Sequence, residues 1–193
     1  MKEAPVGRHV LAWGVVALVT MLSSSAIGQP AVTDLLERLN LSGYPDGIQP
    51  PTFSGRTAAG RRVVLAGLRG RVVLLNFWAT SCLECQAEMP LIEQLHHDFA
   101  AKGLTVVGVN AYEDAPAIRD YAKELDLTFP LVMDPKGQIN GLYRVVVHPT
   151  TFLIGRDGRI VALAIGGRDW SSPPARAIIQ ALLAEPAARK GAR

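Results

Sequence analysis

Two short stretches, residues 72–77 and 104–109, are apolar at almost every position. A strand covered by helices on both faces has this pattern, whereas a strand with one face in water alternates apolar and polar residues. Residues 150–154 and 160–165 are also mainly apolar, and they flank the turn sequence Gly155-Arg156-Asp157-Gly158. This arrangement predicts two buried strands in the middle of the chain and a strand–turn–strand hairpin near its end.

The segments around these strands show helical spacing of apolar residues. Residues 83–101 place Met89, Ile92, Leu95 and Phe99 on one side of a helix. Pro90 within this helix lacks an N–H, so we expect a kink just after the first turns. We also expect helices at residues 33–39, 116–125, 136–143 and 174–184, a turn at 44–47, a hairpin across 52–65 and a short strand at 129–133. The order of these elements predicts an α/β fold with a mixed central sheet and helices on both faces.

The first 28 residues have the pattern of an export signal. Lys2 and Arg8 precede an apolar stretch at residues 10–22, and Ala26 and Gly28 occupy the positions expected before a cleavage site. The apolar stretch is shorter than the ~20 residues that span a bilayer comfortably. A cleaved signal peptide is therefore favoured, with a permanent N-terminal anchor as the alternative.

An exported chain works in the periplasm or at the outer face of the cytoplasmic membrane, where disulfides persist. The rest of the chain divides into three segments. We expect an N-terminal extension with a short helix at residues 29–47, a folded domain at 48–185 and a basic flexible tail at 186–193.

Charge and composition exclude one class of partner. The chain has 193 residues, of which 49% are hydrophobic, enough for one sizeable core. Its formal net charge is +3, but residues 1–28 contribute +1 and residues 186–193 contribute +3, which leaves −1 for the body of the chain. A basic surface that binds nucleic acid is therefore not expected.

Only two cysteines are present, Cys82 and Cys85, and just two residues separate them. They follow the first buried strand and lie at the start of the 83–101 helix, where free backbone N–H groups favour thiolate over thiol. We expect Cys82 to attack a disulfide and Cys85, one turn further into the helix and more enclosed, to resolve the mixed disulfide. The alternative is a structural disulfide or a pair of inert buried thiols.

The segment NFWATSCLECQAEMP at residues 76–90 resembles the active-site segment of the thioredoxin superfamily, in its TlpA/ResA-like branch. Residues 147–154, VHPTTFLI, resemble the second motif of the same family, in which the proline, here Pro149, is cis and lies opposite the thiols. The likeness covers residues 48–185. It implies a thioredoxin-like domain with an N-terminal β-hairpin, an additional strand and helix before the proline, and a Cys82–Cys85 disulfide as the only redox group, without another cofactor.

Glu88 lies three residues after Cys85 and faces a neighbouring side of the same helix. A partly enclosed carboxyl at this place is able to exchange the Cys85 proton, because burial raises its pKa. The resemblance agrees, since the branch carries a functional glutamate at this spacing. Thioredoxins place a buried aspartate where this chain has Asn76, which does not titrate. An ordinary glutamate on the helix surface is the alternative.

We expect the substrate to contact Trp78, on the rim of the site, and His148, Pro149 and Thr150, while Phe77 belongs to the core. His148 either modulates the Cys82 thiolate, joins both sulfurs in holding a metal, or contacts the partner through its backbone alone. We expect the adjacent His96 and His97 on the surface. A further expectation is that Gly166-Gly167 allows close approach of a partner chain.

Leu83 and Glu84 between the cysteines include no proline and place a negative charge beside the sulfurs. Both features favour a reductase over an oxidase. The resemblance implies protein substrates, either apocytochrome c or a copper-assembly factor, and electrons from a membrane thiol donor. Membrane contact is expected only if the N-terminal segment is uncleaved.

Two other functions are less well supported. A copper-binding chaperone would use Cys82, Cys85 and His148, but such proteins on this fold usually separate the cysteines by three residues. A peroxiredoxin needs a threonine and a proline where this chain has Ala79 and Leu75.

Overall fold

The computed structural model describes residue 1 and residues 32–186. The expected signal at 1–28 and almost all of the expected basic tail at 186–193 therefore lie outside the described residues. Within that described part, no helix is both long enough and apolar enough to cross a membrane.

A six-stranded mixed sheet forms the centre of the molecule, with the strand order β1-β8-β7-β4-β5-β6. Its strands are β1 (Ser42–Ile48), β4 (Val72–Trp78), β5 (Leu104–Ala111), β6 (Leu131–Asp134), β7 (Thr150–Ile154) and β8 (Ile160–Ile165). The β4–β5 and β5–β6 pairs are parallel, and the other three pairs are antiparallel. A separate hairpin joins β2 (Ser54–Arg56) to β3 (Arg62–Val64), as predicted for residues 52–65.

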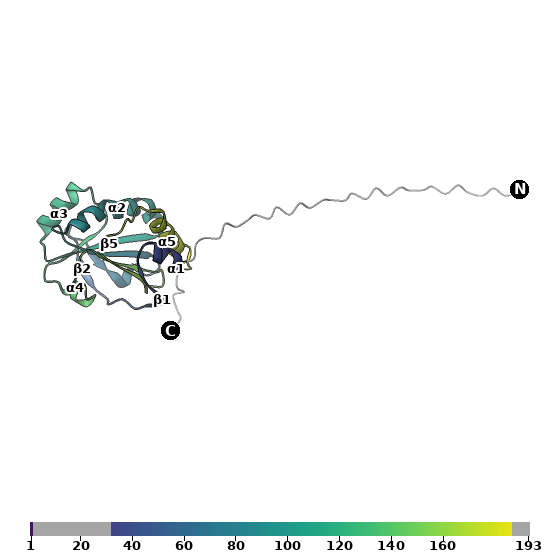
Figure 1. Cartoon of the computed structure of the whole chain (residues 1–193). Coiled ribbons are helices and arrows are strands. Elements are labelled where there is room, and N and C mark those ends of the chain that lie inside the picture. The colour runs from purple at the N-terminus through teal and green to yellow at the C-terminus, as the bar shows by residue number, and fades with distance from the viewer. Residues whose placement is uncertain (2–31, 187–193) are drawn as a thin grey trace.

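Helices cover both faces of the sheet, which confirms the predicted fold class (Figure 1). The helices are α1 (Val32–Arg38), α2 (Leu83–Phe99), α3 (Ala115–Glu124), α4 (Gln138–Leu142) and α5 (Pro173–Ala184). One core cluster joins apolar residues of α1, α2, α3 and α5 to the sheet, and a second joins α4 and the hairpin to its opposite face. β6 and α4 are the strand and helix expected before the proline, and α2 continues as a helix through Pro90.

Residues 44–47 form no turn, contrary to the prediction, but lie within the edge strand β1. The register of β1 against β8 shifts between Gly43 and Ile48, so the strand bulges between these two residues. Gly47 has a φ of 61°, and a Cβ there would lie 2.7 Å from the Cβ of Arg159. The residues with turn-like composition therefore form a bulge within a strand. The sheet begins at Ser42, before the expected domain start at residue 48.

The register of the central strands places the two family motifs at the same end of these strands. Phe77 near the end of β4 pairs with Thr150 at the start of β7, and the two strands are antiparallel. The segment after β4, which leads to Cys82, therefore lies at the same end of the sheet as Pro149, the residue before β7. All seven residues of β4 are buried, so the strand that leads to Cys82 is packed within the core.

Candidate active site

Cys82 and Cys85 form a disulfide at the start of α2, with their Cα atoms 5.2 Å apart. Cys82 is the N-cap of the helix, and its sulfur accepts a hydrogen bond of 3.1 Å from the backbone N–H of Cys85. Cys82 is half-buried, whereas Cys85 is only 1% exposed. The expected difference in access between the two sulfurs is therefore present.

Glu88 is buried, with 2% of its surface exposed, so it is not the surface glutamate of the alternative hypothesis. Its Oε1 accepts hydrogen bonds from Asn76 Nδ2 at 2.8 Å and Thr151 Oγ1 at 3.4 Å, and its Oε2 accepts one from the Arg168 N–H at 3.1 Å. Burial raises the pKa of Glu88 from 4.5 to about 7, although Trp170, the hydrogen bonds from Arg168 N and Thr151 and the Arg168 charge oppose the rise. The carboxyl therefore exchanges a proton readily near neutral pH.

Two more buried side chains complete the surroundings of Glu88. Asn76 Nδ2 also donates to Thr151 Oγ1 at 2.9 Å, so the amide acts as a donor that orients the carboxyl. The indole of fully buried Trp170 favours the charged carboxylate, but its N–H lacks the geometry of a regular hydrogen bond. The sequence analysis missed Thr151, Arg168 and Trp170, which are more than 60 residues from Glu88 along the chain and carry no local signal of this role.

The segment before β7 contains the cis peptide bond between His148 and Pro149, as the resemblance implied. Pro149 and Thr150 are buried; Pro149 O accepts a hydrogen bond from Gly166 N at 2.8 Å, and Thr150 Oγ1 donates to Val147 O at 2.7 Å. Both residues therefore lie largely behind the surface.

The imidazole of the half-buried His148 is hydrogen-bonded to Asn140. Its Nε2 lies 2.9 Å from Asn140 Oδ1, while Asn140 Nδ2 donates to Asp134 Oδ2 at 2.9 Å. Since the Asn140 amide nitrogen is used by Asp134, its oxygen accepts, and His148 Nε2 carries the proton. Burial lowers the pKa of His148, opposed by Glu113, so the neutral imidazole predominates at neutral pH.

Among the described residues, no group of three His, Cys, Asp or Glu side chains is arranged to hold a metal ion. The copper-binding alternative, which needs Cys82, Cys85 and His148 together, therefore gains no support from this geometry.

Two expectations about the site are wrong. Trp78 does not lie on the rim, because its side chain is fully buried against Tyr121, with 5.0 Å between the ring centroids. Its place as the last residue of a strand covered on both faces explains this burial. His96 is half-buried against Phe129, whereas His97 is exposed, as expected.

Glu113 holds the segment that leads to Cys82, and the sequence analysis missed it. Its carboxylate accepts hydrogen bonds from the backbone N–H of Thr80, at 3.0 Å, from the Thr80 hydroxyl and from Asn110 Nδ2. The opposite side of the segment is also held, because Gln86 Nε2 donates to Thr80 O at 2.8 Å. The approach to the disulfide is thus fixed by a residue from the loop after β5.

The Glu84 carboxylate is hydrogen-bonded to the backbone just after β8. Its Oε2 accepts a hydrogen bond of 2.9 Å from Gly167 N, so this N–H is paired within the chain. An open groove of about 470 Å³ runs between α2 and residues 165–169, with Glu84 and Glu88 in its wall.

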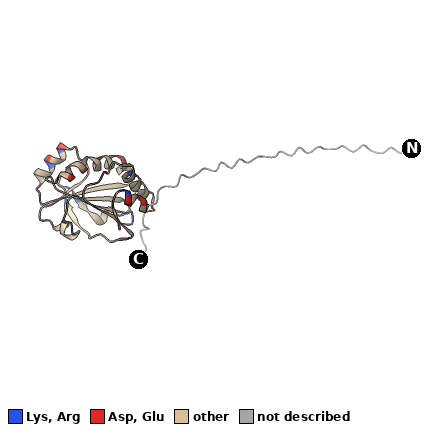
Figure 2. Cartoon of the chain, in the orientation of Figure 1, with Lys and Arg blue, Asp and Glu red and all other residues tan. Residues whose placement is uncertain are grey.

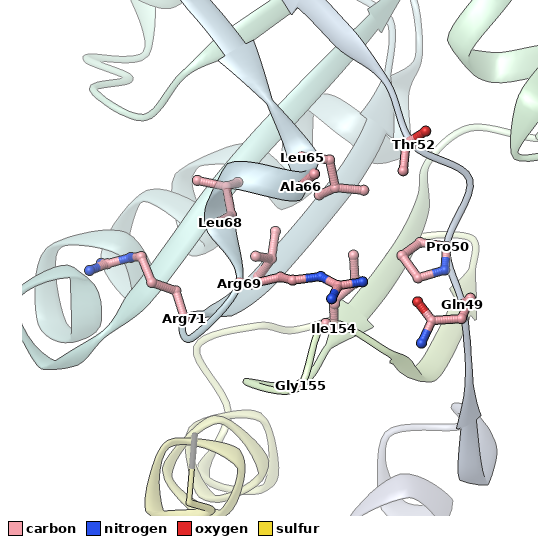
Figure 3. A pocket seen from close by; sticks show the side chains of 12 residues that line it. Gln49, Pro50, Thr52, Leu65, Ala66, Leu68, Arg69, Arg71, Ile154 and Gly155 are labelled. Atoms are coloured by element: carbon pink, nitrogen blue, oxygen red, sulfur yellow. The ribbon is translucent and has the colours of Figure 1, made fainter. Parts of the chain in front are cut away.

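A smaller cavity of about 40 Å³ lies at the opposite end of the sheet (Figure 3). Val73 near the start of β4 and Ile154 at the end of β7 line it, together with Leu65 and Arg69. No cysteine or acidic residue takes part, so this cavity is separate from the redox site.

Lys and Arg residues are interspersed with Asp and Glu along the described ribbon (Figure 2). This distribution agrees with the near-neutral charge of the body of the chain and does not form the basic stripe of a nucleic-acid-binding protein.

Comparisons with known proteins agree with the geometry. The AhpC/TSA family model matches residues 47–163. The thioredoxin-like protein YneN of Bacillus subtilis is 42% identical over 127 residues, which cover 64% of this chain and 74% of YneN. The thiol–disulfide oxidoreductase ResA of Bacillus cereus is 37% identical over 120 residues, covering 62% of this chain and 69% of ResA.

A solved structure shows the same fold. A putative thiol:disulfide interchange protein DsbE from Chlorobium tepidum superposes with a TM-score of 0.66 and 33% identity, covering 71% of this chain and 96% of that protein. The threonine and proline of a peroxiredoxin centre are absent here, where Ala79 and Leu75 stand. The chain therefore belongs to the AhpC/TSA family, as a thioredoxin-like thiol–disulfide oxidoreductase of the ResA and DsbE type.

Proposed function

We propose that the protein is an exported reductase of protein disulfides, in which Cys82 attacks and Cys85 resolves. The observation that carries this proposal is the arrangement on α2 of a half-buried Cys82 at the N-cap, a buried Cys85 and a buried Glu88 with a pKa of about 7. The Cys82–Cys85 pair is the only redox group that this chemistry needs.

The catalytic cycle begins with both cysteines reduced. The Cys82 thiolate attacks one sulfur of a substrate disulfide; that S–S bond breaks, and the first substrate thiolate leaves and takes up a proton. The Cys85 thiol then passes its proton to the Glu88 carboxylate and attacks Cys82 Sγ. The mixed disulfide breaks, the second substrate thiolate leaves and is protonated, and the Cys82–Cys85 disulfide forms. Two electrons have moved to the substrate, and a membrane thiol donor restores the dithiol.

The charges around the pair support the reductive direction. A strong oxidant stabilises its reduced, thiolate form. In this chain, the residue before Cys85 is the acidic Glu84, and burial lowers the pKa of His148, so that its imidazole is neutral at neutral pH. Neither side chain places a positive charge beside the sulfurs, so the disulfide form is favoured and the dithiol is a good electron donor.

Exposed apolar side chains support a protein substrate. Val146 is 90% exposed and Val147 47% exposed directly before the His148-Pro149 bond, while Leu83 and Ile165 are also exposed. Ile165 pairs with Thr150, so it lies beside the proline segment, and Leu83 lies between the cysteines. Apolar residues gathered around a reactive centre are typical of a protein docking surface.

Export, and a role in cytochrome c maturation or copper-site assembly, are supported by the signal pattern at residues 1–28 and by the ResA-like resemblance. Apocytochrome c or a copper-assembly factor would then be the oxidised substrate. We propose the periplasm or the outer face of the cytoplasmic membrane as the location.

Trapping of the mixed disulfide tests this proposal. The Cys85→Ser variant, purified from its native envelope, is expected to carry a covalently bound partner that mass spectrometry identifies as one of these two substrates. The Cys82→Ser variant is the matched control and is expected to carry none. Adducts on Cys82→Ser alone would contradict the assigned roles, and a measured reduction potential close to those of strong periplasmic oxidants would contradict the reductive direction.

A further inference from the structure

The Arg168 guanidinium joins the end of α1 to the end of β8. Its Nε donates to Leu39 O at 2.8 Å and its Nη2 to Asn40 O at 2.9 Å, directly after the last residue of α1. Its Nη1 donates to Gly166 O at 3.2 Å and Gly167 O at 2.8 Å. The two carbonyls that directly follow α1 thus both bind one cationic side chain.

The backbone of the same residue contacts the candidate active site. Arg168 N donates to Glu88 Oε2, while Gly167 N donates to Glu84 Oε2. Two carboxylates one turn apart on α2 therefore hold two consecutive amides of this segment. Arg168 is thus bonded to α2 through its backbone and to the end of α1 through its side chain.

The charged and titratable groups around Glu88 come from two elements. On α2 they are Cys85 and Glu84, and on the segment between β8 and α5 they are Arg168 and Asp169. β4 and β7 contribute the uncharged Asn76 and Thr151. Arg168 is therefore the single positive residue in this set.

We propose that Arg168 is a positioning residue through which the end of α1, at Leu39 and Asn40, controls the proton affinity of the Glu88 carboxyl. The segment before the family domain then forms part of the redox site. α1 is docked on α5 through the buried Leu35, and the two helices lie side by side (Figure 1). The importance of this control for catalysis rests on the proton-transfer role proposed above for Glu88.

A carboxyl titration tests the proposal on the full oxidised chain. The ¹³C signal of the Glu88 side chain is followed against pH in the wild type, Arg168→Met, Arg168→Lys and Arg156→Met. Methionine keeps much of the side-chain volume of Arg168 but removes the positive charge, so the Glu88 midpoint is expected to rise by about half a pH unit or more. Lysine keeps the charge and is expected to restore most of the wild-type value.

Arg156 is the matched control. Its guanidinium also binds backbone carbonyls, those of Gly70, Leu183 and Glu185, but at the opposite end of the sheet. Arg156→Met is expected to leave the Glu88 midpoint unchanged. A midpoint in Arg168→Met that equals that of the wild type overturns the proposal.

The link to α1 is tested with Leu35→Ala, which removes a buried contact of α1. This substitution is expected to raise the Glu88 midpoint when Arg168 is present and to have no effect in the Arg168→Met background. Equal shifts in both backgrounds, or none in either, would show that α1 does not act through Arg168. The titration needs no substrate, so it tests Arg168 separately from catalysis. If Arg168→Met shifts the Glu88 midpoint but leaves the pH profile of disulfide exchange unchanged, the proton-transfer role of Glu88 is refuted and the Arg168 assignment stands.

Discussion

Asn76 Nδ2 donates a hydrogen bond of 2.8 Å to Glu88 Oε1, so a neutral amide on β4 orients a buried carboxyl on α2. Thioredoxins carry a titrating aspartate at the Asn76 position, whereas here the titrating group lies on the helix that also carries both cysteines. The Glu88 carboxyl therefore lies one turn from Cys85 along α2, and the Asn76 amide fixes its direction.

We predict that Glu88→Gln slows the resolving step by about 10-fold or more, because general acid–base groups contribute at least this much. The lifetime of a mixed disulfide between Cys82 and a model substrate measures the step directly, by quenched-flow alkylation. Glu93→Gln is the matched control, since Glu93 is a second buried carboxylate on α2 but binds Thr128 instead. Equal rates in wild type and Glu88→Gln would rule out the proton-transfer role.

Glu88 also makes stability depend on pH. Its pKa is raised from 4.5 to about 7 in the folded protein, so the carboxyl is protonated in both states at low pH and only in the folded state between these values. The stability that it contributes is full below pH 4.5 and is lost as the pH rises through 7, by about 3 kcal/mol in all. Unfolding free energies of the oxidised wild type and Glu88→Gln, compared at pH 4 and pH 8, are expected to diverge by about this amount. Parallel curves would contradict the raised pKa.

Much of this site follows from local sequence. The pair Cys82 and Cys85 at a helix start, the buried β4 strand and the proline motif all have short-range patterns, and each was placed correctly. Arg168 and Glu113 had no such pattern, because their roles arise from contacts with segments that are distant along the chain. The prediction of Trp78 on the rim is wrong because the buried strand continues one residue beyond the apolar run at 72–77, and Tyr121 from α3 packs against the indole.

The fold shows the same limit. Helices and buried strands were predicted from periodicity, which reflects burial within each element. Residues 44–47 have turn-like composition, and only pairing with β8 shows that they bulge within an edge strand. Local composition indicates that Gly47 allows an unusual backbone conformation, but it does not predict that this conformation occurs in a strand paired with β8.

Glu113 is expected to hold the segment before Cys82 in place. Glu113→Gln replaces one acceptor oxygen with an amide that faces the donors of Thr80 and Asn110, so we expect a loss of about 1–3 kcal/mol in stability. Hydrogen exchange of the Thr80 amide is expected to accelerate by about 10-fold or more as the segment opens locally. Glu124→Gln, at an exposed position on α3, provides the control. Unchanged protection of Thr80 would argue against this positioning role.

The apolar surface before the proline motif is expected to bind the protein substrate. The double substitution Val146→Asp and Val147→Asp should lower kcat/KM for a protein disulfide by about 10-fold, because it removes apolar contact area and adds charge. The rate with a small disulfide and the unfolding free energy are expected to stay near wild type, since both side chains are exposed. Val64→Asp, at an exposed position of the β2–β3 hairpin, is the control. Equal losses for both kinds of substrate would point to a damaged active site instead of a docking surface.

The most direct measurement concerns the two sulfurs themselves. The fully reduced protein is treated at pH 8 with one equivalent of iodoacetamide, and peptide mapping shows which cysteine carries the label. Because Cys82 is half-buried at the helix N-cap and Cys85 is 1% exposed, we predict that Cys82 reacts at least about 10-fold faster. Predominant labelling of Cys85, or resistance of Cys82 to alkylation, would contradict the account.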